Sequence, residues 1–140
     1  MTVGPRPLES HATHFENSNR MPRRWLDKFR DAFRGVWLVA SSERSFAVHL
    51  PLAAAVLALG VLLRVSLVEA CLLGLCVTLV LAAETFNSAL ERLAKEIDGE
   101  NNPAIAAALD MASGAVLLSA LGSAAVGSAI FLCRLGVLMR

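Results

Sequence analysis

The chain has 140 residues, enough for one domain, of which 56% are hydrophobic and 18% are charged. The mean hydropathy of +0.58 excludes an ordinary soluble domain. The net charge of +1 gives no reason to expect a nucleic acid as partner. The cysteines Cys71, Cys76 and Cys133 lie inside apolar runs, where a thiol behaves as a small hydrophobe, so neither a disulfide nor a zinc site is predicted.

Residues 1–20 mix Pro, Ser, Asn, His and single charges without apolar periodicity. Such a segment cannot bury enough apolar surface to offset the entropy lost on ordering. It also lacks the apolar stretch and cleavage site of a signal peptide. We therefore expect a disordered cytoplasmic tail over residues 1–20 and a membrane domain over residues 21–140.

An amphipathic helix is predicted over residues 22–40. Apolar residues recur there every three or four positions, and charged residues fill the other faces. Such a helix can pack on a soluble core or lie in the membrane interface. The long apolar segments that follow, together with Trp25 and Trp37, favour the membrane interface.

Three apolar runs follow, over residues 46–65, 67–83 and 111–133. About 20 helical residues cross a bilayer core, so the first and third runs are long enough to span it. The second helix can continue to residue 95, because no Gly or Pro interrupts it between Thr78 and Asp98. The break from Asp98 to Pro103 then leaves spans at about 46–65, 67–95 and 104–135, and an all-α integral membrane fold.

The basic residues predict the orientation of these spans. Eight of the thirteen Lys and Arg residues precede the first span, and Arg92 and Lys95 follow the second. The positive-inside rule therefore places the N-terminus and the second loop in the cytoplasm and the C-terminus outside. On the third helix, Ser119, Ser123 and Gly127 form a stripe of small residues along which the bundle either packs tightly or oligomerises.

Polar residues gather at the cytoplasmic ends of the spans. Glu84, Asn87 and Glu91 stand at i, i+3 and i+7 of the second helix and share one stripe. Asp110 opens the third span, and Glu43 lies in the polar joint before the first. Ionisable residues at membrane depth are functional candidates by default. Their oxygens suit magnesium carrying phosphates, and a site open to water and lipid implies a lipid hydroxyl as phosphoryl acceptor.

These residues also have structural interpretations. The alternatives are ion pairs of Glu91 with Arg92 or Lys95, a helix–helix contact for Asn87, a dipole contact for Asp110, and helix capping by Glu43 with the neighbouring Ser41 and Ser42. Glu84 is explained least well, because no basic residue lies within four positions of it. Glu69, at the opposite face with Arg64 nearby, is assigned no chemistry.

Four segments resemble the prokaryotic diacylglycerol kinase and undecaprenol kinase family of trimeric, three-span membrane kinases. They are residues 29–35, similar to the family's F-x-x-A-x-x-G stretch, residues 43–46 with His49, residues 83–91 and residues 110–117. The E-x-x-N-[ST]-[AS]-[IL]-E element at residues 84–91 is highly specific. The resemblance spans about residues 22–135. It implies a homotrimer of the bacterial inner membrane, with composite sites between subunits, that uses ATP and Mg²⁺ to phosphorylate diacylglycerol or undecaprenol.

The resemblance also implies roles for single residues. Glu84 falls on the catalytic base, with Asn87 beside it, and Glu43 and Glu91 fall on the carboxylates that hold magnesium and nucleotide. The other nucleotide-contacting positions correspond to Arg24, Glu100 and Asp110. The lipid-contacting positions correspond to Arg24, Glu84 and Ser113.

The sequence departs from the family pattern at two charged positions. Leu109 replaces a lysine that precedes the third-helix aspartate, and Lys95 replaces an acid four residues after Glu91; the loop at residues 100–102 also differs. Lys95 either supplies the charge that Leu109 lacks or forms an i, i+4 pair with Glu91. Leu109 keeps a second function open, that of a non-catalytic family member which binds lipid or nucleotide.

Overall fold

The computed structural model describes residues 25–97 and 102–139, and this part of the chain is all-helical. Its helices are α1 (Trp25–Ser42), α2 (Arg44–Leu62), α3 (Leu67–Glu96) and α4 (Pro103–Leu138). These bounds agree within a few residues with the predicted amphipathic helix and the three predicted spans. The predicted tail over residues 1–20 lies outside the described residues.

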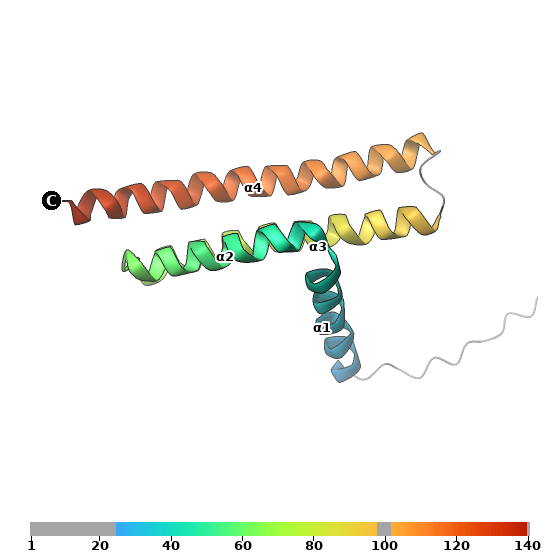
Figure 1. Ribbon diagram of the computed structural model, residues 1–140, viewed down its shortest axis with the longest axis horizontal. Coiled ribbons are helices and arrows are strands. Elements are labelled where there is room, and N and C mark those ends of the chain that lie inside the picture. Colours follow the sequence, from blue (N-terminus) through green and yellow to red (C-terminus); the bar gives the residue numbers. More distant parts are fainter. Residues whose placement is uncertain (1–24, 98–101, 140) are drawn as a thin grey trace, which may run out of the picture.

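Helices α2, α3 and α4 form an elongated bundle in which α3 packs against both of the others, while α1 leaves the bundle at a steep angle (Figure 1). Each of the three bundle helices is long and apolar enough to cross a membrane, with a mean hydropathy of 2.1 in its most apolar stretch. Most of their large apolar side chains lie on the outside of the bundle. An apolar surface of this extent is typical of contact with lipid, so the fold is that of a three-span membrane protein.

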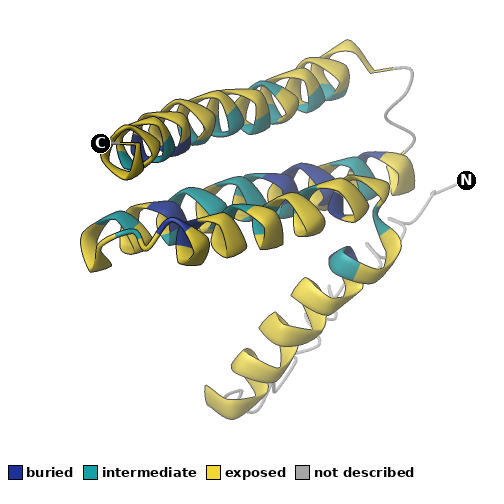
Figure 2. Ribbon diagram, turned by 60° about the vertical axis from the view of Figure 1, so that its left-hand side comes forward, coloured by how far each residue is buried: buried dark blue, intermediate teal, exposed yellow. Residues whose placement is uncertain are grey.

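Leu73 of α3 is the most deeply buried side chain of the described chain, with only 2% of its surface exposed. Gly60 of α2 and Gly127 of α4 face its side chain from the two neighbouring helices. Ser123 of α4 donates a hydrogen bond to the Cys76 carbonyl oxygen of α3 at 3.3 Å. Buried and half-buried residues follow these contact lines (Figure 2). The small residues of α4 therefore serve close packing within the chain.

The apolar face of α1 is uncovered in the described part of the chain. Trp25, Phe33 and Trp37 are each 75% exposed, and Val39 near the end of the helix is its one buried residue. This exposure contradicts the alternative in which the helix packs on a soluble core. A place for α1 in the membrane interface stays a prediction.

The joint between α1 and α2 differs from the expected capping arrangement. The hydroxyls of Ser41 and Ser42 donate to the carbonyl oxygens of Trp37 and Leu38, at 2.8 and 2.6 Å, and so belong to α1. The N-cap of α2 is Glu43, whose side chain makes no capping hydrogen bond. The predicted capping roles are therefore wrong, because α1 continues through the serines and their hydroxyls bond back to its last turn. The Glu43 carboxylate is left for other contacts.

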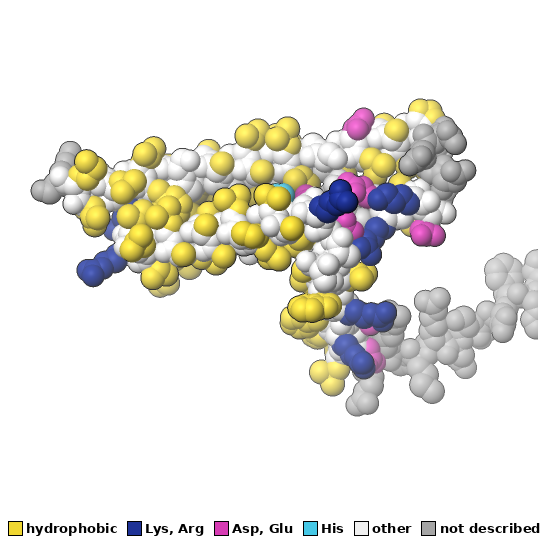
Figure 3. Space-filling view, viewed as in Figure 1, with side chains coloured by type: hydrophobic (Ala, Val, Ile, Leu, Met, Phe, Trp, Pro, Cys, Tyr) yellow, Lys and Arg dark blue, Asp and Glu magenta, His cyan; other side chains and the backbone are white. Residues whose placement is uncertain are grey.

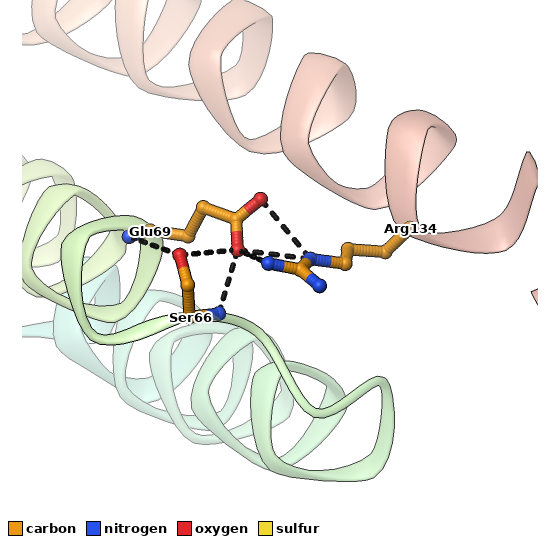
Figure 4. Close-up of polar contacts among 3 residues, drawn as sticks. All are labelled: Ser66, Glu69 and Arg134. Carbon is orange, nitrogen blue, oxygen red and sulfur yellow. Dashed lines mark hydrogen bonds and ion pairs between the residues drawn. The ribbon is translucent and has the colours of Figure 1, made fainter. Parts of the chain in front are cut away.

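An ion pair joins α3 to α4 at the end of the bundle far from α1 (Figure 4). Arg134 Nε donates to Glu69 Oε2 at 2.9 Å and to Oε1 at 3.1 Å. The same carboxylate accepts from the Ser66 backbone N at 2.6 Å and closes a capping box at the start of α3. Glu69 therefore fixes both the first turn of α3 and its contact with α4, although the sequence had suggested Arg64 as its neighbour.

The three spans predict that the two termini lie on opposite sides of the membrane. A reporter before residue 1 should be accessible from the cytoplasm and one after Arg140 from outside, because an odd number of crossings separates them. A reporter inserted at the α2–α3 turn, which should be external, is the internal control. Both termini on one side would contradict the fold.

The Glu69–Arg134 pair predicts a coupled effect on stability. Arg134→Met should lower the midpoint of thermal unfolding in detergent, because it leaves Glu69 as an uncompensated charge between two apolar helices. Adding Glu69→Met should restore part of the loss, since no charge is then left unpaired. A double variant with the summed loss of the two single variants would show that the pair does not couple the helices.

Candidate functional site

The charged side chains of the bundle lie at the two ends of the apolar spans (Figure 3). One end combines the α1–α2 joint, the last turns of α3 and the first turns of α4, and the other holds the Glu69–Arg134 pair. The predicted site residues within the described ranges all belong to the first end. We take this end as the candidate active site.

A buried polar stripe runs along α3 at this end. Glu84, Asn87 and Ser88 are exposed by only 4%, 9% and 3% of their surface. Ser88 was not singled out from the sequence, although its i+4 spacing from Glu84 is the signal that places it on the same face. Glu84 has no hydrogen bond or ion pair in the described part of the chain. No buried side-chain oxygen of the described chain lacks a hydrogen-bond partner, so the unpartnered Glu84 oxygens must reach the surface, where they are available to accept a proton.

Asn87 connects the stripe to two other polar residues. Its Nδ2 donates to Glu91 Oε1 at 2.7 Å, and its Oδ1 accepts from the Ser113 hydroxyl of α4 at 3.4 Å. Glu91 therefore bonds to Asn87 and not to Arg92 or Lys95 within the described residues. The amide both joins two helices, as one alternative proposed, and fixes the orientation of the Glu91 carboxylate.

Glu43 forms an ion pair with Arg92 of α3. Arg92 Nε lies 2.8 Å from Glu43 Oε1, and a terminal guanidinium nitrogen lies 2.7 Å from the same oxygen. That nitrogen also donates to the Ser42 hydroxyl. From the sequence, Arg92 was expected only as a partner of Glu91, because a contact between residues 49 positions apart cannot be inferred from their spacing. The pair brings Glu43 beside the residue that follows Glu91.

The remaining predicted residues are Asp110, Lys95, Arg24 and Glu100. Asp110 is exposed on the first turns of α4, three residues before Ser113. Lys95 is exposed in the last turn of α3 and forms no ion pair among the described residues. Arg24 and Glu100 lie outside the described residues, so their predicted contacts with nucleotide and lipid stay predictions.

The carboxylates at this end of the bundle are few for a metal site. Among the described residues, no three His, Cys, Asp or Glu side chains come together in a group that could hold a metal ion. Magnesium usually takes one or two carboxylates and completes its coordination with water and substrate phosphates. Two carboxylates, such as the predicted ligands Glu43 and Glu91, are enough in number for a metal that arrives with a nucleotide, and their role as ligands stays a prediction.

An apolar groove of about 290 Å³ lies between the three spans. On α3 it reaches Leu81, one turn before Glu84, and it is lined also by His49 of α2 and Ser123 of α4. His49 Nδ1 lies 2.8 Å from the Ser45 carbonyl oxygen one turn earlier in α2. The apolar groove therefore ends within one turn of Glu84 on α3.

Comparison with known proteins identifies the family. The model of the prokaryotic diacylglycerol kinases matches residues 30–131. The chain belongs to this family. An undecaprenol kinase of Bacillus subtilis is 36% identical over 112 residues, covering 80% of this chain and 91% of that protein. A diacylglycerol kinase of Synechocystis is 34% identical over 115 residues, covering 81% of this chain and 66% of that protein. No solved structure gives a significant match.

Membership in the prokaryotic diacylglycerol kinase family confirms the predicted enzyme class, a membrane-bound lipid kinase. The matched range contains every predicted site residue except Arg24. It therefore includes both carboxylates predicted to hold the metal and the buried stripe on α3.

Proposed function

We propose that this protein transfers the γ-phosphoryl group of ATP to the hydroxyl of a membrane lipid, diacylglycerol or undecaprenol, at the cytosolic face of a bacterial inner membrane. The observation that carries the proposal is Glu84, a buried carboxylate without a partner in the described chain. An ionisable group at this depth without a partner costs free energy, so it is a candidate for a functional role. General-base chemistry is such a role, because it requires a free carboxylate.

The residues around Glu84 divide the remaining tasks. Glu43 and Glu91 would hold Mg²⁺, which would neutralise the charge that develops on the transferred phosphoryl group. Asn87 orients Glu91 through its hydrogen bond of 2.7 Å. Glu84 accepts the proton of the lipid hydroxyl as its oxygen bonds to phosphorus, and ADP leaves with the electrons of the broken P–O bond. Asp110 and Ser113 lie at the α4 side, where nucleotide and lipid would meet.

A lipid acceptor is supported by the surroundings of the base. The apolar groove reaches within one turn of Glu84 on α3, so a hydrocarbon chain in the groove would bring its hydroxyl end to the carboxylate. The exposed Trp residues of α1 suit the headgroup region, where this helix would keep the site at the cytosolic surface. A homotrimer would supplement the two carboxylates of one chain with groups from a neighbour.

The alternative is a family member that binds lipid or nucleotide without turnover. Leu109, an apolar residue beside Asp110, is the observation that favours it, because a positive charge is missing there. Purified protein in detergent with Mg-ATP and a panel of lipid alcohols separates the two functions. A folded protein that phosphorylates none of these lipids would exclude the kinase.

Glu84→Gln should lower turnover at least about 100-fold, because it keeps the shape of the side chain and removes the base. Binding of a non-hydrolysable ATP analogue should be retained. Ser88→Ala, one position from Asn87 on the same buried stripe, is the matched control for a disturbed helix face and should keep most of the activity. Normal lipid phosphorylation by Glu84→Gln would remove Glu84 from the mechanism.

We expect Lys95 to supply the positive charge that is missing at Leu109. The competing Glu91–Lys95 pair is not formed in the described chain, since Glu91 bonds to Asn87. Lys95→Met should therefore reduce turnover about 100-fold at saturating Mg-ATP, as expected for a lost charge near the transferred phosphoryl group. Loss of a surface ion pair would cost about twofold.

The test of Lys95 includes a rescue. Leu109→Lys should restore activity to Lys95→Met, because a lysine on the neighbouring helix would supply the missing charge. A nearly silent Lys95→Met would show that the charge is not needed.

A further inference from the structure

The contact between Arg92 and Glu43 is not used by the proposed reaction. Two of the three guanidinium nitrogens converge on one oxygen, Glu43 Oε1, at 2.7 and 2.8 Å, and one of these two also bonds to Ser42. Glu43 Oε2 has no partner in the described part of the chain. The arginine thus connects the last turns of α3 to the α1–α2 joint through a carboxylate to which the proposed function gives another task.

A carboxylate held by a guanidinium is a poor ligand for a free divalent cation. The two positive charges would share one small anion and repel each other at contact distance. Glu91 keeps its negative charge, since the hydrogen bond to its Oε1 comes from the neutral amide of Asn87, so the competition between Arg92 and a cation concerns Glu43. Arg92 therefore competes with a cation for the Glu43 carboxylate, of which it holds Oε1.

Arg92 is placed so that it can leave. Its side chain is 40% exposed and that of Glu43 is 24% exposed, so both are in contact with water at the end of the bundle. A triphosphate carries more negative charge than one carboxylate and offers the oxygen pairs that a guanidinium binds in bidentate fashion. Arrival of a nucleotide would therefore attract Arg92 away from Glu43.

We propose that Arg92 is a placeholder cation. It neutralises Glu43 in the nucleotide-free protein and passes to the phosphates of the incoming nucleoside triphosphate, which frees Glu43 for the metal that the nucleotide carries. The inference rests on the proposed function, because it takes Glu43 as a metal ligand. Metal alone then binds weakly, and metal and nucleotide bind together.

The proposal predicts effects of opposite sign on two ligands. Mn²⁺ serves as the metal probe, and its free concentration is measured by electron paramagnetic resonance on the purified full chain, with and without a non-hydrolysable ATP analogue. Arg92→Met should bind Mn²⁺ alone about tenfold more tightly, since the competing charge is gone. It should bind the analogue about tenfold more weakly, since a charged phosphate contact is lost. Arg92→Lys should leave Mn²⁺ binding close to wild type and weaken the analogue partly.

Arg134→Met is the matched control, because it also removes an arginine that pairs with a glutamate across two helices but lies at the other end of the bundle. It should change neither affinity. The proposal is overturned if Arg92→Met weakens both ligands together or changes neither, or if Arg134→Met behaves in the same way. If Arg92→Met does not fold, Arg92→Lys decides, and unchanged analogue binding by that variant overturns the proposal.

Failure of the proposed function has a different signature. A folded wild type that binds neither Mn²⁺ nor the analogue, and phosphorylates no lipid, overturns both proposals. A wild type that binds both and phosphorylates lipid, while Arg92→Met binds them unchanged, overturns the role of Arg92 alone.

Discussion

The core of a bilayer offers no hydrogen-bond partner to a polar side chain, and this constraint decides where the charges of this protein lie. Each unsatisfied polar group there costs several kcal/mol. The hydroxyls of Thr78 and Thr85 accordingly donate to the carbonyl oxygens of Gly74 and Leu81 in their own helix. The Ser123 hydroxyl of α4 donates to the Cys76 carbonyl oxygen of the neighbouring α3. The interhelical ion pairs of the described chain lie at the two ends of the bundle.

Glu84 is the carboxylate that lies nearest to this apolar region in the part of α3 that the structure describes. The residue is only 4% exposed and has neither a cation nor a donor as partner in the described chain, while its carboxylate oxygens keep contact with the surface. A residue that served packing alone would be apolar at this depth, because a lone carboxylate weakens the fold. Asn87 and Ser88 lie on the same face of α3 as Glu84. The buried polar stripe therefore lies between the apolar groove and the charged end of the bundle.

Much of the fold could be predicted from the sequence because the determining signals are local. Helix lengths follow from apolar runs, and the ends follow from residues such as Ser66, which caps α3, and Pro103, which opens α4. The capping prediction for Ser41 and Ser42 failed for a local reason as well, since a serine near the end of a helix can bond backward into its last turn as easily as forward into the next helix.

The ion pairs could not be predicted, because they join positions 49 and 65 residues apart. Sequence spacing suggested two partners for Glu91 within four positions on its own helix, Arg92 and Lys95. In the structure Glu91 instead accepts a hydrogen bond from Asn87, and Arg92 pairs with Glu43 at the α1–α2 joint. The buried polar stripe was predictable as a helical face, whereas the partner of each charge depends on how the helices pack.

Helix α3 is tied to its neighbours by different means, and the difference determines which part of the site can move. To α4 it is joined by the Glu69–Arg134 pair at one end and the Ser113–Asn87 bond at the other. To α2 it is joined by apolar packing around Leu73 and Gly60, far from the site, and to the α1–α2 joint by Arg92. Release of Glu43 by Arg92 would therefore loosen the joint while the α3–α4 face that carries Glu84 stays fixed. If the proposed roles hold, the site would combine a base on a fixed helix face with a carboxylate that becomes available when a nucleotide compensates the arginine.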